Sequence, residues 1–149
     1  MRVTLSVAYA SRRQAPKRAA LARWARAALE GLRGPRVMVG VRVVNESESA
    51  GLNERYRGRR GATNVLAFPF EAPPGGSSEM LGDLVICAPV VNREARAQNK
   101  AATAHWAHMV VHGIMHLRGY DHQTRRQADV MERKEATVLR RLGYADPYL

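Results

Sequence analysis

Three histidines in the second half of the chain, His112, His116 and His122, have the spacing H-x3-H-x2-G-x2-H. Four residues of α-helix rise about 6 Å and return to nearly the same face, so His112 and His116 can bind one divalent ion. Gly119 is expected to end that helix, because glycine readily adopts the left-handed conformation of a C-terminal cap, and the chain can then bring His122 to the ion. Three protein ligands leave a coordination position open, which is typical of catalytic metal sites.

The other two histidines, His105 and His108, precede this trio, so that all five histidines of the chain lie between residues 105 and 122. His108 shares the helical face but lies about 12 Å of rise before His116, too far to bind the same ion. We expect it beside the ligands or lining a cleft, with a hydrogen-bonded core histidine as the alternative. His105 is expected at the surface, near the start of the helix.

The histidine pattern also matches that of metzincin proteases, H-E-x-x-H-x-x-G-x-x-H, except at Gly113. In those enzymes a glutamate at this position acts as general base in peptide hydrolysis. Cleavage of a phosphodiester can proceed without that carboxylate, because the metal lowers the pKa of water and phosphate oxygens can take part in proton transfer. Gly113 therefore points away from a protease.

The composition describes one globular domain over residues 1–149, with 46% hydrophobic and 25% charged residues. The net charge is +11, and of 24 basic residues only Lys17, Lys100 and Lys134 are lysines. The planar guanidinium of arginine suits phosphate, so a polyanion such as RNA is the expected partner. An arginine- and alanine-rich composition with simply solvated charges is the alternative.

The chain has neither a run long enough to span a membrane nor, in residues 1–7, the apolar core of a signal peptide. These features predict a cytoplasmic location and no membrane partner. The single cysteine, Cys87, lies in an apolar run and is expected to be a buried, inert thiol rather than a fourth metal ligand.

Hydrophobic periodicity and turn residues predict an α+β (α/β-like) fold, a small mixed sheet of about four strands packed with about five helices. Pro69 places its strand at a sheet edge or ends it, because proline cannot donate a ladder hydrogen bond. Residues 72–78 are expected to form a flexible loop, not a domain boundary. The expected strands are 3–9, 37–44, 64–70 and 81–87, and the expected helices are 16 to about 32, 45–56, 89–98, the metal-site helix 102–117, and 124–142.

Three blocks of the sequence resemble the YbeY family of bacterial endoribonucleases: HWAHMVVHGIMHLRGYDH, LNERYRGRRGATNVLAFPF and LGDLVIC. The resemblance covers about residues 45–149, and the first 44 residues match only in general pattern. The histidine block with its Gly-Tyr-Asp-His ending is highly specific. Ala67 departs from the serine of many members, and the Ala62-Thr63 pair lacks a proline that often precedes the threonine.

The resemblance implies a single-strand-preferring, metal-dependent endoribonuclease that hydrolyses RNA with a zinc-bound water. Its implied roles are maturation of small-subunit ribosomal RNA and ribosome quality control. The implied partners are the ribosomal RNA precursor and the ribosome, and protein partners in ribosome assembly are also possible. One Zn²⁺ per chain would be held by the family's three histidines, which fall on His112, His116 and His122. The family's functionally important arginine falls on Arg57.

Further roles follow as hypotheses. Arg57 would stabilise charge on the phosphoryl oxygens, the alternative being a surface arginine. Asp121 would orient a ligand imidazole, or else be a plain turn or capping residue. Candidates for contact with backbone phosphates are Arg59, Arg60 and Arg118.

Tyr120 and Phe68 could stack on a base of single-stranded RNA, although residues of these types more often belong to a core. Two other functions stay open: a metzincin-like metalloprotease, and a non-catalytic, zinc-stabilised RNA-binding factor in ribosome assembly. The imidazole ligands favour zinc, but they would also accept nickel, cobalt or copper.

Overall fold

The computed structural model describes residues 1–75 and 78–149, so residues 76–77 of the expected 72–78 loop lie outside the described residues. These described residues form a four-stranded mixed sheet and five helices, which confirms the predicted α+β class. In order, the elements are β1 (Arg2–Tyr9), α1 (Arg18–Ala28), β2 (Arg36–Val44), α2 (Glu46–Arg57), β3 (Val65–Pro69), β4 (Met80–Cys87), α3 (Ala88–Ala97), α4 (Ala102–Leu117) and α5 (Arg125–Arg141). Within the described ranges, no helix is long and apolar enough to cross a bilayer.

The strands are arranged in the order β1-β2-β4-β3. β1 and β4 both run parallel to β2, whereas β3 runs antiparallel to β4. β3 is therefore an edge strand, as Pro69 predicted. Cys87 ends β4 as a buried free thiol, also as predicted, and burial raises its pKa.

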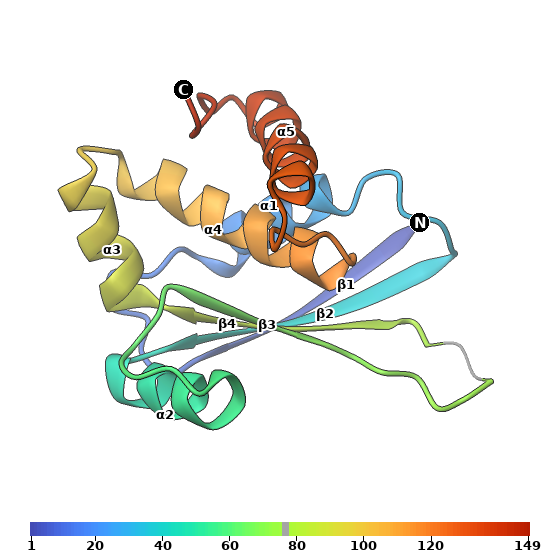
Figure 1. Ribbon diagram of the computed structural model, residues 1–149, viewed down its shortest axis with the longest axis horizontal. Helices are drawn as coiled ribbons and strands as arrows, with labels where there is room; N and C mark the ends of the chain where they lie inside the picture. The colour runs from blue at the N-terminus through green and yellow to red at the C-terminus, as the bar shows by residue number, and fades with distance from the viewer. Residues whose placement is uncertain (76–77) are drawn as a thin grey trace.

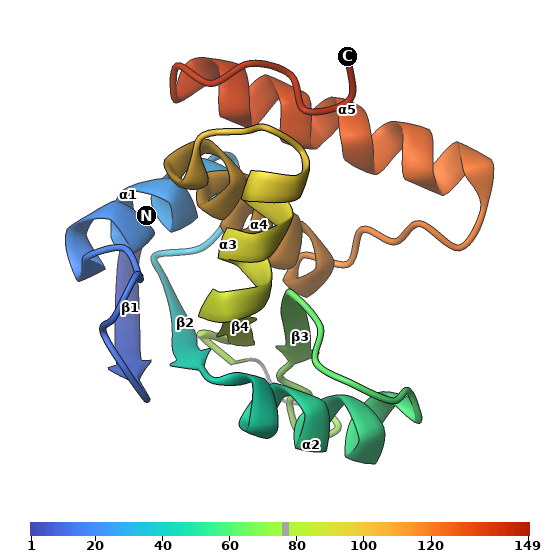
Figure 2. The same cartoon turned by 90° about the vertical axis from the view of Figure 1, so that its left-hand side faces the viewer.

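The helices cover the two faces of the sheet unequally (Figures 1 and 2). α1, α4 and α5 lie on one side, and α2 lies on the other. α4 is the central helix: it contacts α1, α3 and α5 as well as β3 and β4. Its apolar residues therefore surround most of its circumference, as expected for a helix enclosed by other elements. The candidate metal ligands His112 and His116 thus project from a helix that other elements hold in place on several sides.

Helix ends follow local chemistry. α1 ends at Ala28 rather than near residue 32, so the predicted end was wrong: after the C-cap Leu29 the chain turns through Gly31, whose φ is +86°. At α5, Thr124 forms a capping box with Gln127.

At α2, the side chain of Asn45 accepts a hydrogen bond from the backbone N–H of Glu48 at 2.9 Å. No reciprocal capping box forms here, because the Glu48 carboxylate instead binds Arg42 at 2.5 Å. The helix still begins where the sequence predicts, and it ends at Arg57, next to the cleft described below.

Candidate metal centre

The structure brings the imidazoles of His112, His116 and His122 together. One ring nitrogen of each lies within 4.8 Å of the others. The ring centroids are 4.7 Å apart for His112 and His116, and 4.9 Å apart for His116 and His122. The spacing of the two α4 residues by one turn and the return of the chain to His122 therefore produce one cluster.

Gly119 provides the turn that returns His122 to the helix. Its φ is +98°, and its N–H donates to the carbonyl oxygen of His116 at 3.0 Å. The N–H of Tyr120 donates to the carbonyl oxygen of Met115 at 3.0 Å, which completes a Schellman motif. The prediction that Gly119 caps the helix is confirmed.

Asp121 belongs to the same turn. Its carboxylate accepts a hydrogen bond from the backbone N–H of His122 at 2.7 Å. This contact fixes the backbone of a candidate ligand rather than its imidazole, so an imidazole-orienting role for Asp121 stays a prediction.

A residue that sequence reasoning missed contacts the cluster directly. Oε1 of Glu135, on α5, lies 2.6 Å from Nδ1 of His112, and the Glu135 side chain is fully buried. An ionised carboxylate only accepts hydrogen bonds, so Nδ1 of His112 carries a proton, and in the neutral imidazole Nε2 then keeps its lone pair for a metal. One feature of the sequence could have indicated this residue: Glu135 has helical spacing from Met131, Val138 and Leu139, which form the buried face of α5.

The protonation states suit metal binding. Burial alone would raise the pKa of Glu135, but hydrogen bonds from His108, His112 and Tyr148 outweigh it and hold the pKa at about 2. Burial lowers the pKa of His116, and the neighbouring His112 and His122 lower it further. A neutral imidazole is the form that binds a metal, so at neutral pH little proton release opposes binding at His116.

His108 lies beside the cluster rather than in it. Its Nε2 lies 3.2 Å from Oε2 of Glu135, and the residue is buried. His108 therefore shares a carboxylate with the candidate ligand His112, which is the placement beside the ligands that the sequence suggested.

His105 was predicted at the surface, and this was wrong. It is only 3% exposed, and its Nε2 lies 2.9 Å from Oε1 of Glu94. The reason is that α3 packs against α4 and brings Glu94 to His105. Glu94 also accepts from the side-chain amide of Asn64, at 3.1 Å, so this partly buried contact reaches the start of β3.

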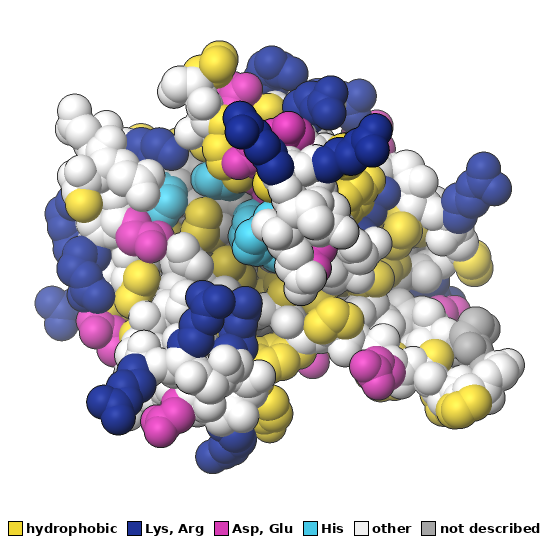
Figure 3. Space-filling model, viewed as in Figure 1, with side chains coloured by type: hydrophobic (Ala, Val, Ile, Leu, Met, Phe, Trp, Pro, Cys, Tyr) yellow, Lys and Arg dark blue, Asp and Glu magenta, His cyan; other side chains and the backbone are white. Residues whose placement is uncertain are grey.

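The cluster opens into a cleft of about 710 Å³. One wall carries the three histidines, and the other is formed by Arg57 at the end of α2 and by the segment that leads to β3, including Arg59 and Asn64. Figure 3 shows histidine side chains in a hollow, with basic side chains on the facing lobe. The structure thus places Arg57 and Arg59 opposite the metal candidates.

The other two candidates for phosphate contact, Arg60 and Arg118, do not line this cleft in the described part of the chain. The Arg118 guanidinium donates to the carbonyl oxygen of Ala28 at 2.8 Å, at the C-terminal end of α1, where a cation is favoured. A phosphate contact by Arg118 would compete with this bond, and for both arginines it stays a prediction.

The two aromatic candidates are separated by the sheet. Tyr120 lines the cleft, whereas Phe68 packs edge-on against Tyr56 of α2, with ring centroids 5.3 Å apart. Only Tyr120 is therefore placed where a base in the cleft could reach it.

Gly113 lies on the side of α4 that packs against the sheet. A Cβ at this position would lie 2.7 Å from Cδ2 of Leu84 and 3.2 Å from Cγ2 of Val65. The packing of helix on sheet thus leaves no room for the glutamate that metzincins carry at the corresponding place.

Taken as a ligand set, the cluster fits a divalent metal ion. It offers three imidazoles, one fixed by a buried carboxylate and another kept neutral by its surroundings. An all-nitrogen set of this kind suits zinc and other borderline transition metals.

The fold is shared with a solved structure. The solution structure of a protein from Thermotoga maritima matches 97% of this chain and 98% of its own, with a TM-score of 0.57 and 23% sequence identity. At this identity the likeness concerns the fold alone.

Curated relatives are much more similar in sequence. The protein named endoribonuclease YbeY from Methylococcus capsulatus is 52% identical over 98% of this chain and 95% of its own. The proteins of the same name from Alkalilimnicola ehrlichii and Nitrosococcus oceani are 56% and 50% identical, over 89% and 99% of this chain and 82% and 98% of their own. The family model described as endoribonuclease YbeY matches residues 8–143. This chain therefore belongs to the endoribonuclease YbeY family.

Proposed function

We propose that residues 1–149 form one endoribonuclease domain that holds one zinc ion through His112, His116 and His122 and cleaves single-stranded RNA. The proposed substrate is the precursor of small-subunit ribosomal RNA, with a further role in ribosome quality control alongside protein partners. The names of the relatives support RNA cleavage, and the resemblance of the histidine and arginine blocks supports the ribosomal substrate.

The main observation behind the proposal is that candidate metal ligands and cationic side chains line the same cleft. Three convergent imidazoles lie on one wall, and Arg57 and Arg59 lie on the other. A phosphodiester between the walls would meet a metal site and cationic donors together. The sum of charges favours such a polyanion, since the chain carries +11.

Each residue around the cleft has its own proposed role in binding the metal or the RNA. Glu135 would orient His112 so that Nε2 is left to bind the metal, and the Gly119 turn brings His122 to the other two histidines. Arg57 would bind the phosphoryl oxygens and stabilise the charge that develops on them. A bound zinc ion would supply Lewis acidity, which lowers the pKa of water and neutralises phosphoryl charge.

Two variants test this division. His116→Ala should lose zinc and RNA cleavage together, whereas Arg57→Glu should keep zinc, measured by elemental analysis, and lose cleavage. Arg55→Glu is the matched control, because Arg55 lies on the same helix but does not line the cleft among the described residues. Cleavage that survives both the loss of His116 and the removal of zinc would contradict the proposal.

A metzincin-like protease is the first rival function. It shares the metal cradle but lacks the general-base glutamate, and a Cβ at Gly113 would lie 2.7 Å from Cδ2 of Leu84. Digestion of casein by the zinc-loaded protein should be undetectable. Proteolysis that His116→Ala abolishes would favour the rival.

The second rival is a non-catalytic RNA-binding factor in which zinc only stabilises the fold. The open cleft beside the histidines favours catalysis, because structural zinc sites are closed by a fourth protein ligand. End-mapped digestion of a ribosomal RNA precursor by wild-type and His112→Ala protein, prepared in parallel, separates the two. RNA binding that chelation leaves unchanged, without any metal-dependent cut, would support the rival.

A further inference from the structure

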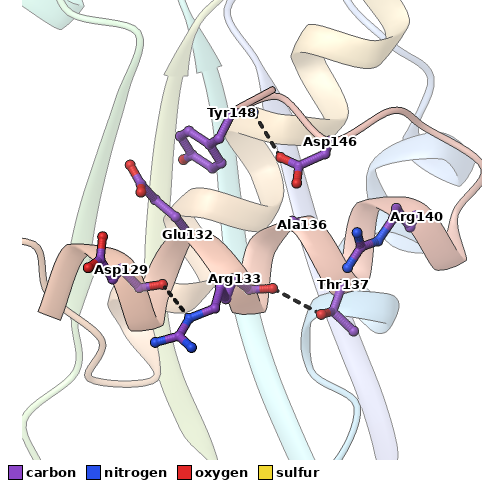
Figure 4. Close-up of a pocket in the computed structure, with 8 residues that line it drawn as sticks. All are labelled: Asp129, Glu132, Arg133, Ala136, Thr137, Arg140, Asp146 and Tyr148. Atoms are coloured by element: carbon purple, nitrogen blue, oxygen red, sulfur yellow. Dashed lines mark hydrogen bonds between the residues drawn. The ribbon is translucent and has the colours of Figure 1, made fainter. Parts of the chain in front are cut away.

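The segment after α5 turns back along that helix and brings Tyr148 to Glu135. The hydroxyl of Tyr148 donates a hydrogen bond to Oε2 of Glu135. The Asp146 side chain accepts from the backbone N–H of Tyr148 at 2.9 Å, and Pro147 between them restricts the backbone. Figure 4 shows this turn beside α5, where Tyr148 borders a groove of about 590 Å³. A short local motif thus fixes the placement of the phenol.

Glu135 joins this phenol to the metal candidate. Its Oε1 accepts from Nδ1 of His112 at 2.6 Å, and its Oε2 accepts from Tyr148. The Glu135 side chain has no exposed surface, so in the folded protein its oxygens are held by protein donors. A carboxylate in such a place keeps one orientation only while protein donors satisfy both oxygens.

His108 is the other donor near Oε2. Its Nε2 lies 3.2 Å from that oxygen and 3.1 Å from the Tyr148 hydroxyl, so it is shared between the two. Without the hydroxyl, His108 alone would hold Oε2, and the carboxylate could turn towards His108 at the expense of His112.

We infer that Tyr148 is a positioning residue for the candidate metal ligand His112 and acts through Glu135. The hydroxyl fixes the carboxylate, the carboxylate keeps the proton of His112 on Nδ1, and Nε2 is left as the ligand atom. Among the described residues, the Tyr148 hydroxyl forms hydrogen bonds only with Glu135 and His108. The inference rests on the proposed metal site, but its first consequence exists in the protein without metal.

The first experiment is ¹⁵N NMR of the histidine side chains in metal-free protein. Wild-type His112 should be the Nδ1–H tautomer with a hydrogen-bonded ring proton. Tyr148→Phe, which keeps the ring, should broaden or shift that signal and mix the tautomers. The control is Tyr144→Phe, whose hydroxyl contacts only Arg23, at 3.5 Å, among the described residues; it should leave His112 unchanged. An identical His112 spectrum in Tyr148→Phe and wild type would overturn the inference.

The second experiment is competition for Zn²⁺ with a chromophoric chelator. Tyr148→Phe should bind zinc about three- to tenfold more weakly, the loss expected for one net hydrogen bond, whereas Tyr144→Phe should match wild type. If wild type binds zinc and Tyr148→Phe binds it equally well, the inference fails while the proposed function stands. If wild type binds no zinc, the proposed function fails, and the tautomer of His112 still decides whether Tyr148 positions it.

Discussion

Oε1 of Glu135 lies 2.6 Å from Nδ1 of His112, although the two residues belong to different helices and lie 23 positions apart. The contact joins α5 to α4 through the interior of the protein, because the Glu135 side chain is fully buried. It also sets which nitrogen of His112 is free. The arrangement of α5 on α4 is therefore part of the candidate metal centre as well as of the core.

Replacing the carboxylate tests this contact. Glu135→Gln should weaken zinc binding by about 10- to 100-fold, the usual cost of losing a carboxylate behind a histidine ligand. Glu71→Gln removes the same charge from an exposed loop position and should leave zinc affinity unchanged. The measurement is chelator competition, with circular dichroism to verify folding. Equal zinc affinities for a folded Glu135→Gln and wild type would contradict the role given to Glu135.

The two helical glycines Gly113 and Gly51 should respond oppositely to alanine. At Gly113 a Cβ would lie 2.7 Å from Leu84, so Gly113→Ala should lower the free energy of unfolding by about 1–2 kcal/mol despite the better helix propensity. At Gly51 of α2 a Cβ meets nothing within 4 Å, so Gly51→Ala should raise it by about 0.5–1 kcal/mol. Urea unfolding measures both. Stabilisation by Gly113→Ala would show that α4 can move away from the sheet.

Glu94 should support the far wall of the cleft without contributing to metal binding. Glu94→Ala leaves the buried His105 without its partner at 2.9 Å and frees Asn64, so stability should fall by about 2–3 kcal/mol. RNA cleavage should also fall, because Asn64 lines the cleft, whereas zinc content should not change. Glu46→Ala is the control: its ion pair with Arg93 is half exposed and should be worth less than about 1 kcal/mol. Loss of zinc from Glu94→Ala would refute this separation.

The Arg42–Glu48 pair predicts a pH dependence. The hydrogen bond from Arg42 holds the pKa of Glu48 below its ordinary value of 4.5. Because the folded state binds this proton less readily than the unfolded state, the pair stabilises the fold above pH 4.5, and that contribution is lost as the pH falls through the lowered pKa.

Carboxyl NMR titration of wild type and Arg42→Gln checks this prediction. The pKa of Glu48 should rise towards 4.5 in Arg42→Gln, and the acid-dependent part of the stability should shrink. Arg36→Gln, which breaks the looser 3.8 Å contact with Glu79, should leave the titration of Glu48 as in wild type. An unchanged pKa of Glu48 in Arg42→Gln would mean that the exposed pair is not maintained in solution.

Local signals in the sequence predicted the elements that carry the ligands. α4 was expected at residues 102–117 and spans Ala102–Leu117, because a long apolar pattern ends at Gly119. Pro69 located the edge strand, since its missing N–H excludes a central position. The end of α1 was misplaced because the chain already turns at Gly31, before the expected end near residue 32.

Such local signals could not predict which residues of different helices contact one another. His105 looked like a surface residue because nothing in its own helix indicates that α3 covers it. Glu135 was missed for the same reason, as its partner His112 is defined only by the packing of α5 on α4. A charged residue on an otherwise apolar helical face is the cue that could have found it.

The three candidate ligands differ in how the fold supports them. His112 and His116 project from the enclosed helix α4, whereas His122 is exposed on the short connection between Gly119 and Thr124. An incoming ion would find two ligands already held in place on α4, and only the short connection that carries His122 would have to adjust around it. Capture and release of the metal should then be governed by that connection, so that exchange rates can be tuned there while the interior keeps its packing.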